Sequence, residues 1–193
     1  MRQLRTVFKG LTHRSLFRKV EAKVEDKIGY IYLNSPSDFN ALSIDMRNSI
    51  SQAIRSHEAS NDVKVILFLS KVPKAFCAGA NIKEFVGKTA KDFDNNDIFK
   101  DIHDSIYQAK KPILSAVNGV ALGGGCELAL LTDVVFCSED ARFALPELKL
   151  GLIPGIGGTQ RLARIAGRVN ANRYVFTSDF ISSKRAYELG IVS

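Results

Sequence analysis

Two glycine-containing turns in the sequence could present backbone N–H groups to a carbonyl oxygen or an anion. The first, at residues 78–80 (AGA), follows a predicted buried strand, and its small side chains leave the main chain accessible. The second, at residues 123–125 (GGG), leads directly into a predicted helix. The first N–H groups of a helix have no intrahelical acceptor and lie at the positive end of the helix dipole. Such groups bind anions, and they stabilise a carbonyl oxygen that gains negative charge during a reaction.

A glycine run by itself is weak evidence for a site, because glycine also marks tight turns and close packing. The Gly-Lys-Ser/Thr of a P-loop does not follow residues 123–125, so the run does not predict nucleotide-phosphate binding. A third glycine-rich segment, residues 151–162 (GLIPGIGGTQRL), predicts a rigid loop that is either the wall of a site or a tight connection.

Two glutamates near these segments are candidates for acid–base chemistry. Glu127 lies in the first turn of the helix that follows the glycine run, and Glu147 follows Pro146 between apolar neighbours. Each also has a purely structural interpretation. An acid in a first helical turn complements the helix dipole, and Glu147 could be a surface acid of a loop. Twenty positions and a predicted strand separate the two, so their spacing does not show that they meet.

Cysteine and histidine give no indication of a metal site or a disulfide framework. The three cysteines (Cys77, Cys126 and Cys137) have no CxxC spacing, and the three histidines (His13, His57 and His103) are widely separated. Buried thiols are the default interpretation, and no metal is predicted.

Strand-like and helix-like patterns alternate along the chain, which favours an α/β fold with parallel pairing. Strands are predicted at 20–24 and 29–33 (a hairpin around residues 25–27), at 64–70 (buried on both faces), at 113–117 and at 134–137. Helices are predicted after the capping residue Ser43 (apolar stripe Met46, Ile50, Ala53, Ile54, His57), from Asp97 (stripe Ile98, Ile102, Ile106, Ala109), at 121–131, and from Ser182 to Gly190.

The positive charge of the chain is concentrated at its start. Hydrophobic residues make up 46% and charged residues 24% of the 193 residues, as in an ordinary soluble globular protein, and no apolar run approaches the ~18 residues of a membrane helix. Six cations precede the first acid, Glu21, and subtracting them from the formal net charge of +7 leaves +1. These six are Arg2, Arg5, Lys9, Arg14, Arg18 and Lys19. The composition of residues 1–20 therefore predicts a mitochondrial transit peptide, and residues 21–193 are predicted to form one domain. The alternative for residues 1–20 is a basic arm that binds RNA or anionic lipid.

Three motifs together resemble the crotonase (enoyl-CoA hydratase/isomerase) superfamily. They are residues 75–84 (AFCAGANIKE), residues 118–129 (NGVALGGGCELA), and the Pro-Glu at 146–147 followed by residues 151–162. Their order and separations match the superfamily, and the similarity runs from about Val24 to Ser193. The resemblance implies a spiral of ββα units that binds a coenzyme A thioester.

The resemblance also assigns roles to individual residues. The N–H groups of Ala80 and Gly124 match the oxyanion hole. Ala41, Ala78, Asn81 and Ile82 fall where family members line the path of the CoA adenine and pantetheine, and Gly155 matches a glycine that helps to place the water. The family usually has Asp where this chain has Asn81, which removes a charge near the CoA path and leaves the backbone donors intact.

Within the superfamily the carboxylates decide the reaction, and the hydratases carry both Glu127 and Glu147. By the family's roles, Glu127 holds and deprotonates the water and Glu147 exchanges a proton at the α-carbon. Two carboxyls facing one water do not both ionise freely, so one should have a raised pKa. The resemblance thus implies an enoyl-CoA hydratase of the mitochondrial matrix, in fatty-acid or branched-chain amino-acid breakdown, with no cofactor besides the CoA of the substrate.

Three alternatives remain open at this point. One is another crotonase reaction, such as double-bond isomerisation. A second is a non-catalytic or RNA-binding crotonase-like protein, which the nearly neutral body disfavours because phosphate binding needs clustered cations. The third is a truncated product, because family members continue for roughly 70 residues beyond this sequence. With that C-terminal helical part, the family implies a homotrimer or dimer of trimers; nucleic acid and membrane are not expected as partners.

Overall fold

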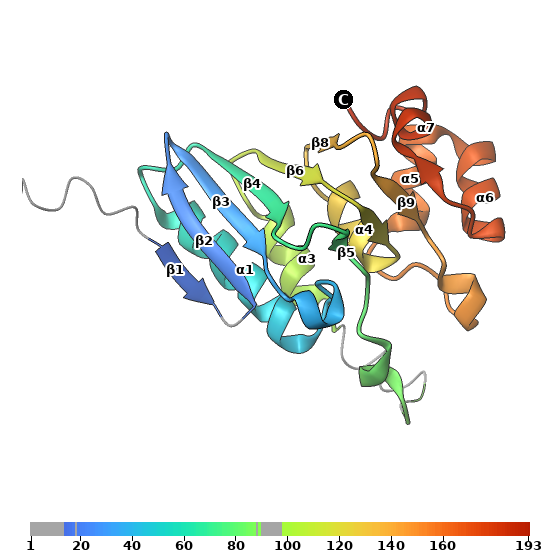
Figure 1. Cartoon of the computed structure of the whole chain (residues 1–193), viewed down its shortest axis with the longest axis horizontal. Coiled ribbons are helices and arrows are strands. Elements are labelled where there is room, and N and C mark those ends of the chain that lie inside the picture. The colour runs from blue at the N-terminus through green and yellow to red at the C-terminus, as the bar shows by residue number, and fades with distance from the viewer. Residues whose placement is uncertain (1–13, 18, 88, 90–97) are drawn as a thin grey trace, which may run out of the picture.

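The computed structural model describes residues 14–17, 19–87, 89 and 98–193, which form two β-sheets and the helices packed against them (Figure 1). The strands are β1 (Arg14–Phe17), β2 (Val20–Glu25), β3 (Ile28–Leu33), β4 (Val65–Ser70), β5 (Ala75–Cys77), β6 (Ile113–Val117), β7 (Val120–Leu122), β8 (Val134–Cys137), β9 (Arg142–Ala144) and β10 (Ile181–Ser182). The helices are α1 (Ile44–Ala59), α3 (Lys100–Tyr107), α4 (Gly124–Leu130), α5 (Gly158–Ala166), α6 (Arg168–Thr177) and α7 (Ser183–Glu188). Short 3-10 helices lie at η1 (Pro36–Asp38), η2 (Ile82–Phe85) and η3 (Glu147–Leu150).

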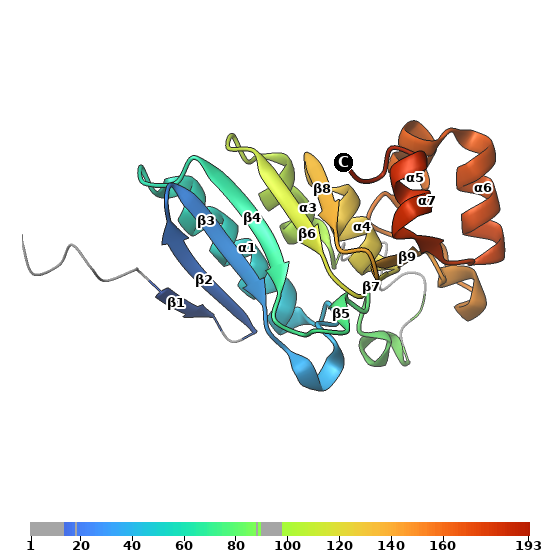
Figure 2. The same ribbon diagram turned by 45° about the horizontal axis from the view of Figure 1, so that its top comes forward.

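From β4 to β9, successive strands alternate between the two sheets. The larger sheet has the order β1-β2-β3-β4-β6-β8, and the smaller one has the order β10-β9-β7-β5. The strand pairs β4–β5, β6–β7 and β8–β9 therefore each send one strand to either sheet, and helical segments follow each pair. Figure 2 shows the strands of the larger sheet side by side, with α5, α6 and α7 at the end away from β1. This arrangement is the predicted spiral of ββα units.

Much of the sequence pattern is confirmed. The predicted stripe of α1 is buried, since Met46, Ile50, Ala53 and Ile54 are 0% exposed and His57 is 3% exposed. The Ser43 side chain caps this helix by accepting a hydrogen bond from the Met46 N–H, and Ser182 caps α7 in the same way. The predicted hairpin and the strands at 113–117 and 134–137 are also found.

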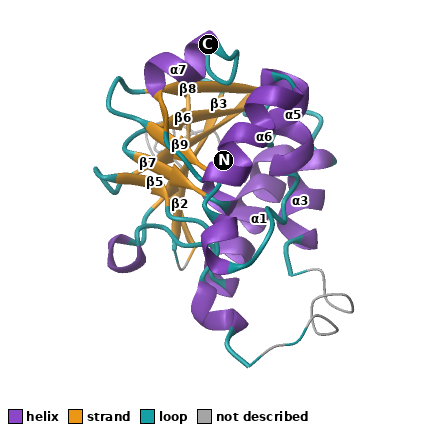
Figure 3. Ribbon diagram, turned by 90° about the vertical axis from the view of Figure 1, so that its right-hand side faces the viewer, coloured by secondary structure: helices purple, strands orange, loops and turns teal. Residues whose placement is uncertain are grey.

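Three local predictions differ from the structure. Residues 121 and 122 belong to strand β7 and not to a helix, because they pair with both β5 and β9, and the helix begins at Gly124. Strand β4 is buried on one face only, with Ile66 and Phe68 inside and their neighbours partly exposed; helices cover one face of the strands (Figure 3). Helix α3 begins at Lys100, and the predicted start, Asp97, lies outside the described residues.

Part of the predicted transit peptide lies on the larger sheet. Strand β1 pairs antiparallel with β2, with Arg14 opposite Lys23 and Phe17 opposite Val20. Residues 1–13 and 18 lie outside the described residues. The sheet therefore starts before the predicted domain boundary at residue 20. Within the described ranges, no helix is both long and apolar enough to cross a membrane.

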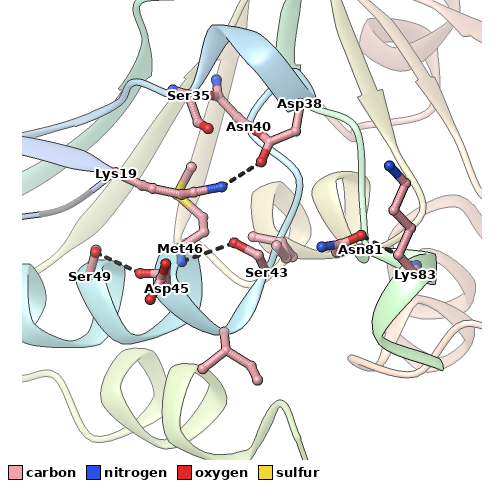
Figure 4. Close-up of polar contacts among 12 residues, drawn as sticks. Lys19, Ser35, Asp38, Asn40, Ser43, Asp45, Met46, Ser49, Asn81 and Lys83 are labelled. Atoms are coloured by element: carbon pink, nitrogen blue, oxygen red, sulfur yellow. Dashed lines mark hydrogen bonds and ion pairs between the residues drawn. The ribbon is translucent and has the colours of Figure 1, made fainter. Parts of the chain in front are cut away.

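Asn40 ties the loop before α1 to the strand segment that leads into the first glycine turn. Its side chain is fully buried, and its amide bonds Ser35 N (2.7 Å), Ser70 Oγ (2.8 Å) and Phe76 O (2.9 Å). Its φ is +60°, a left-handed conformation that Asn tolerates better than most residues. Figure 4 shows Asn40 beside Ser35, in the loop that an ion pair between Lys19 and Asp38 closes at 2.5 Å.

The same loop bonds directly to the glycine turn. The Ala78 N–H donates to Phe39 O (3.0 Å), and the Leu42 N–H donates to Gly79 O (2.8 Å). Leu42 and Ala80 form an isolated parallel bridge. The position of the Ala80 backbone therefore depends on this loop, and the loop depends on Asn40.

We expect Asn40→Gly to lower the free energy of unfolding by about 2–4 kcal/mol. The substitution leaves the buried Ser35 N–H and the buried Phe76 carbonyl without their hydrogen-bond partner, but glycine still adopts the left-handed backbone conformation. Asn40→Ala should cost about 1 kcal/mol more, because a Cβ without the local amide is strained at positive φ. Urea unfolding of the two variants and the wild-type chain measures both differences. An Asn40→Gly variant as stable as wild type would contradict this account of the loop.

Candidate active site

The candidate site lies at the carboxyl ends of three neighbouring strands of the smaller sheet. Strands β5, β7 and β9 are parallel and adjacent. Each is followed, directly or after one residue, by one of the segments singled out in the sequence: residues 78–80, residues 123–125, and the Pro-Glu at 146–147. Because parallel strands end at the same edge of a sheet, the three segments meet there.

A cavity of about 410 Å³ opens at this edge. Its lining combines both glycine turns, both glutamates and an apolar wall: Ala78, Gly79, Ala80, Ile82, Phe85, Ile98, Phe99, Gly123, Gly124, Glu127, Pro146, Glu147, Leu150, Leu152, Ile153 and Gly155. Such a cavity, mostly apolar with a few convergent polar groups, is typical of a small-molecule site.

The two backbone donors predicted from the sequence lie next to each other. A Cβ placed on Gly124 would be 3.5 Å from the Ala80 N, and a Cβ placed on Gly79 would be 3.4 Å from the Gly124 N. Gly79 has a φ of +94°, and its Cβ would also be 2.6 Å from Leu122 O, so the turn requires glycine. Gly124 is the first residue of α4, where its N–H has no intrahelical acceptor. The two N–H groups therefore lie close together in the lining of the cavity.

Glu127 is a buried carboxylate that backbone donors hold in place. It is 1% exposed, and its Oε1 accepts hydrogen bonds from Ile156 N (2.8 Å) and Gly158 N (2.7 Å). Burial raises the pKa of this carboxyl, whereas the backbone donors and the charge of Arg161 oppose that rise. The donors come from the glycine-rich segment that leads into α5 and from its first residue, so this segment fixes the direction of the carboxylate.

Glu147 has fewer partners and keeps its proton more strongly. It is half-buried at the start of η3, and its Oε1 lies 2.9 Å from the place where a Cβ on Gly123 would be. Its Oε2 is buried and has no hydrogen-bond partner among the described residues. Burial, together with the charge of Glu127, raises the pKa of Glu147 to about 7. Near neutral pH Glu147 can therefore carry a proton.

The structure brings together all but two of the predicted site residues. Those that line the cavity are Ala78, Ala80, Ile82, Gly124, Glu127, Glu147 and Gly155. Ala41 and Asn81 are not among its lining residues. Asn81 instead caps η2, with its Oδ1 accepting from Lys83 N at 3.3 Å (Figure 4). The role of each of these residues in catalysis or CoA binding stays a prediction.

Sequence reasoning missed two parts of the site. The first is the apolar wall of Phe85, Ile98, Phe99, Leu150 and Leu152, which carries no motif. The second is the pair of N–H groups that hold Glu127, since any residue type can donate a backbone hydrogen bond. The glycine-rich loop was the available signal for this second part. In the part of the chain that the structure describes, no group of three or more His, Cys, Asp or Glu side chains could hold a metal ion.

Comparison with known proteins agrees with this fold and identifies the family. The family model for enoyl-CoA hydratase/isomerase matches residues 23–193. A mitochondrial enoyl-CoA hydratase of Pongo abelii is 43% identical over 166 residues, which are 86% of this chain and 57% of that protein. A probable enoyl-CoA hydratase of Mycobacterium leprae is 40% identical over 167 residues, 86% of this chain and 64% of that protein.

Among solved structures, an enoyl-CoA hydratase subunit I of Geobacillus kaustophilus superposes with a TM-score of 0.88 at 38% identity, covering 92% of this chain and 68% of that one. The α/β spiral with its site at the strand ends is therefore the crotonase fold. The chain belongs to the enoyl-CoA hydratase/isomerase family, and it spans about three fifths of the length of the two relatives that it matches.

The raised pKa of Glu147 should appear in the pH dependence of stability. The unfolded chain releases this proton near pH 4.5 and the folded chain near pH 7, so between these values the folded state binds the extra proton and the free energy of unfolding falls as pH rises. Glu147→Gln removes this contribution, and the variant should lose less stability over that interval. Urea unfolding at closely spaced pH values measures the two curves; parallel curves would contradict the assignment.

Proposed function

We propose that the chain hydrates 2-enoyl-CoA thioesters to 3-hydroxyacyl-CoA. The observation that carries the proposal is the convergence, in one cavity, of two backbone donors (Ala80 and Gly124) and two carboxyl groups of different proton affinity (Glu127 and Glu147). The names of the matched relatives support the same reaction.

The backbone donors would act on the thioester carbonyl. Two N–H groups that bond its oxygen withdraw electrons from the conjugated double bond, which makes the β-carbon susceptible to water. Negative charge then develops on that oxygen, where preorganised donors are most effective. Loss of one such donor in other enzymes costs ~10²–10³ in rate.

The two glutamates would supply the acid and the base. Ionised Glu127 accepts a proton from the water whose oxygen bonds to the β-carbon, and protonated Glu147 gives its proton to the α-carbon. The water is thus added across the double bond, and the proton that Glu127 gained returns to Glu147 before the next turnover. This division follows the difference between the two sites, because backbone donors stabilise the anion of Glu127, whereas none of the described residues donates to the buried Oε2 of Glu147. The reaction needs no cofactor besides the CoA of the substrate.

Glu127→Gln and Glu147→Gln should each lower kcat for crotonyl-CoA hydration by about 10²–10⁴, because each removes one proton-transfer group. The double variant should be little slower than the worse single one, since the two groups act as a unit. Loss of the enoyl-thioester absorbance measures the rate. Glu139→Gln, at an exposed acid outside the cavity, is the matched control and should stay within about twofold of wild type.

If the two active-site variants hydrate crotonyl-CoA at the wild-type rate, the assigned roles are wrong. If wild type converts a 3-enoyl-CoA to the 2-enoyl isomer but does not add water, the reaction is isomerisation instead of hydration.

We also propose that residues 1–20 direct the chain to the mitochondrial matrix. The acid-free, Arg-rich composition of this segment supports targeting, and the Pongo abelii relative is named a mitochondrial protein. Relatives also occur in bacteria, as in Mycobacterium leprae, so family membership by itself does not select the compartment.

A fluorescent reporter at the C-terminus of the full chain should colocalise with mitochondria. Replacing Arg2, Arg5 and Lys9 by Gln should leave the reporter in the cytosol, because import signals depend on these cations. The three lie before β1 in the sequence, and none of them belongs to a described strand. Lys64→Gln, Lys110→Gln and Lys184→Gln together remove the same charge from exposed positions of the body and should not change the location; equal mislocalisation of both triple variants would contradict the targeting role.

A further inference from the structure

A second cavity, of about 330 Å³, adjoins the candidate active site. Its lining residues are Phe99, His103, Gly155, Ile156, Gly157, Gln160, Arg161 and Arg164. Phe99 and Gly155 line both cavities. Gly155 is next to Ile156, whose N–H bonds Glu127, so the second cavity begins close to that carboxylate. Of the two shared residues only Phe99 has a side chain, so its ring is the side-chain wall that the two cavities have in common.

The two cavities differ in what they offer an acyl chain. Around the glutamates, the first has an apolar wall that includes Phe85, Leu150 and Leu152. The second is lined by two guanidinium groups and an amide, Arg161, Arg164 and Gln160. Burial and the nearby charge of Arg164 lower the pKa of Arg161, so these two cations are close to each other. Methylene groups that entered this space would take water away from charged groups, which is unfavourable.

A buried arginine lies over the Phe99 ring. The guanidinium carbon of Arg47, a residue that is 6% exposed, lies 5.1 Å from the ring centroid, within the range of a cation–π interaction. Arg47 Nη1 donates to Leu42 O and to Glu84 Oε2 (3.2 Å). The other oxygen of Glu84 accepts from Ile44 N at 3.0 Å.

The backbone of Phe99 is fixed as well. Phe99 is the N-cap residue of α3, and its carbonyl accepts from the His103 N–H at 3.0 Å. Both the ring and its attachment are therefore restrained, and Arg47 connects this wall to the residue, Leu42, that bridges to Ala80.

From this geometry we infer that Phe99, positioned by Arg47, limits the length of the acyl chain that the site accepts. The inference rests on the proposed function, because it takes the first cavity as the acyl-CoA site. A short acyl chain ends against the Phe99 ring. A longer chain must displace the ring from Arg47 and then place methylenes among the cations of the second cavity, and both steps oppose binding. The substrates are accordingly short-chain 2-enoyl-CoA thioesters, and Phe99 is a specificity-determining residue.

The test measures the affinity of the full chain for saturated acyl-CoAs, which cannot be hydrated. Isothermal titration with butyryl-, hexanoyl-, octanoyl- and decanoyl-CoA should give wild-type affinities that stop rising at a short chain length. Phe99→Ala should raise the octanoyl-to-butyryl affinity ratio by about fourfold to tenfold, because each methylene newly buried in the space of the ring is worth roughly fourfold. Phe85→Ala is the matched control: Phe85 lines the first cavity only, so its loss should change all affinities by a similar factor.

Arg47 is tested by the same ratio. Arg47→Ala should shift it in the direction of Phe99→Ala, whereas Arg47→Lys keeps a cation near the ring and should restore most of the wild-type ratio. If Arg47 had only a structural role, Arg47→Ala would lower the affinity for all acyl-CoAs by the same factor. Circular dichroism and the thermal midpoint verify that each variant is folded; a variant that does not fold leaves the decision to Phe99→Ala and Phe85→Ala.

The outcomes separate this inference from the proposed reaction. Wild-type affinity that rises steadily to decanoyl-CoA, or equal ratios in Phe99→Ala and Phe85→Ala, would overturn the role of Phe99. If the affinity ratios are as expected but crotonyl-CoA is not hydrated, the proposed reaction is wrong and the limit on acyl-chain length is still supported. Absence of binding by every acyl-CoA would overturn both.

Discussion

The parallel register of β5, β7 and β9 is the constraint on which the site depends. Cys77 is opposite Ala121, and Leu122 is opposite Ala144, so the three strands end at one edge. Each strand has only three residues, and each owes its place to a longer strand of the other sheet that precedes it in the chain. The larger sheet thus determines where the turns after the short strands lie. Segments that are over 60 positions apart in the sequence meet because the ββα unit repeats, not because of any local preference.

A buried charge then joins this strand edge to the helices that follow. A carboxylate that is as buried as Glu127 is unfavourable without donors. Ile156 N and Gly158 N supply them, so the loop before α5 must come to α4. A Cβ on Gly158 would lie 2.9 Å from Glu127 Cγ, which explains the small residue at that position. The same contacts separate the proton affinities of the two glutamates, since they oppose the rise that burial causes in the pKa of Glu127, whereas Glu147 receives no comparable pair of donors.

The sequence predicted those parts of the structure that local chemistry determines. The stripe of α1, the Ser43 cap and the glycine turns follow from periodicity, capping and backbone freedom. The local pattern does not show that Ala121 and Leu122 form a strand, because this strand is only three residues long and is stabilised by neighbours that come from distant segments. That Glu127 and Glu147 meet could not be derived from their spacing either, because it depends on the pairing of β7 with β9. The resemblance to a known family supplied that relation, and the structure gives its physical basis.

Chemistry and selectivity arise from different parts of this fold. The donors and carboxyls lie at strand ends or in the first turns after them, where register and backbone conformation leave little freedom. The apolar wall comes from connections, such as η2, the start of α3 and the loop after η3, that need not satisfy a sheet. Connections of this kind tolerate change better than the elements that they join. Arg47 is an exception that links the two parts, because it contacts both the wall at Phe99 and the carbonyl of Leu42 beside Ala80. A substitution at Phe99 would therefore also affect the backbone of Ala80, whereas substitutions at Leu150 or Leu152 could alter the acyl pocket alone.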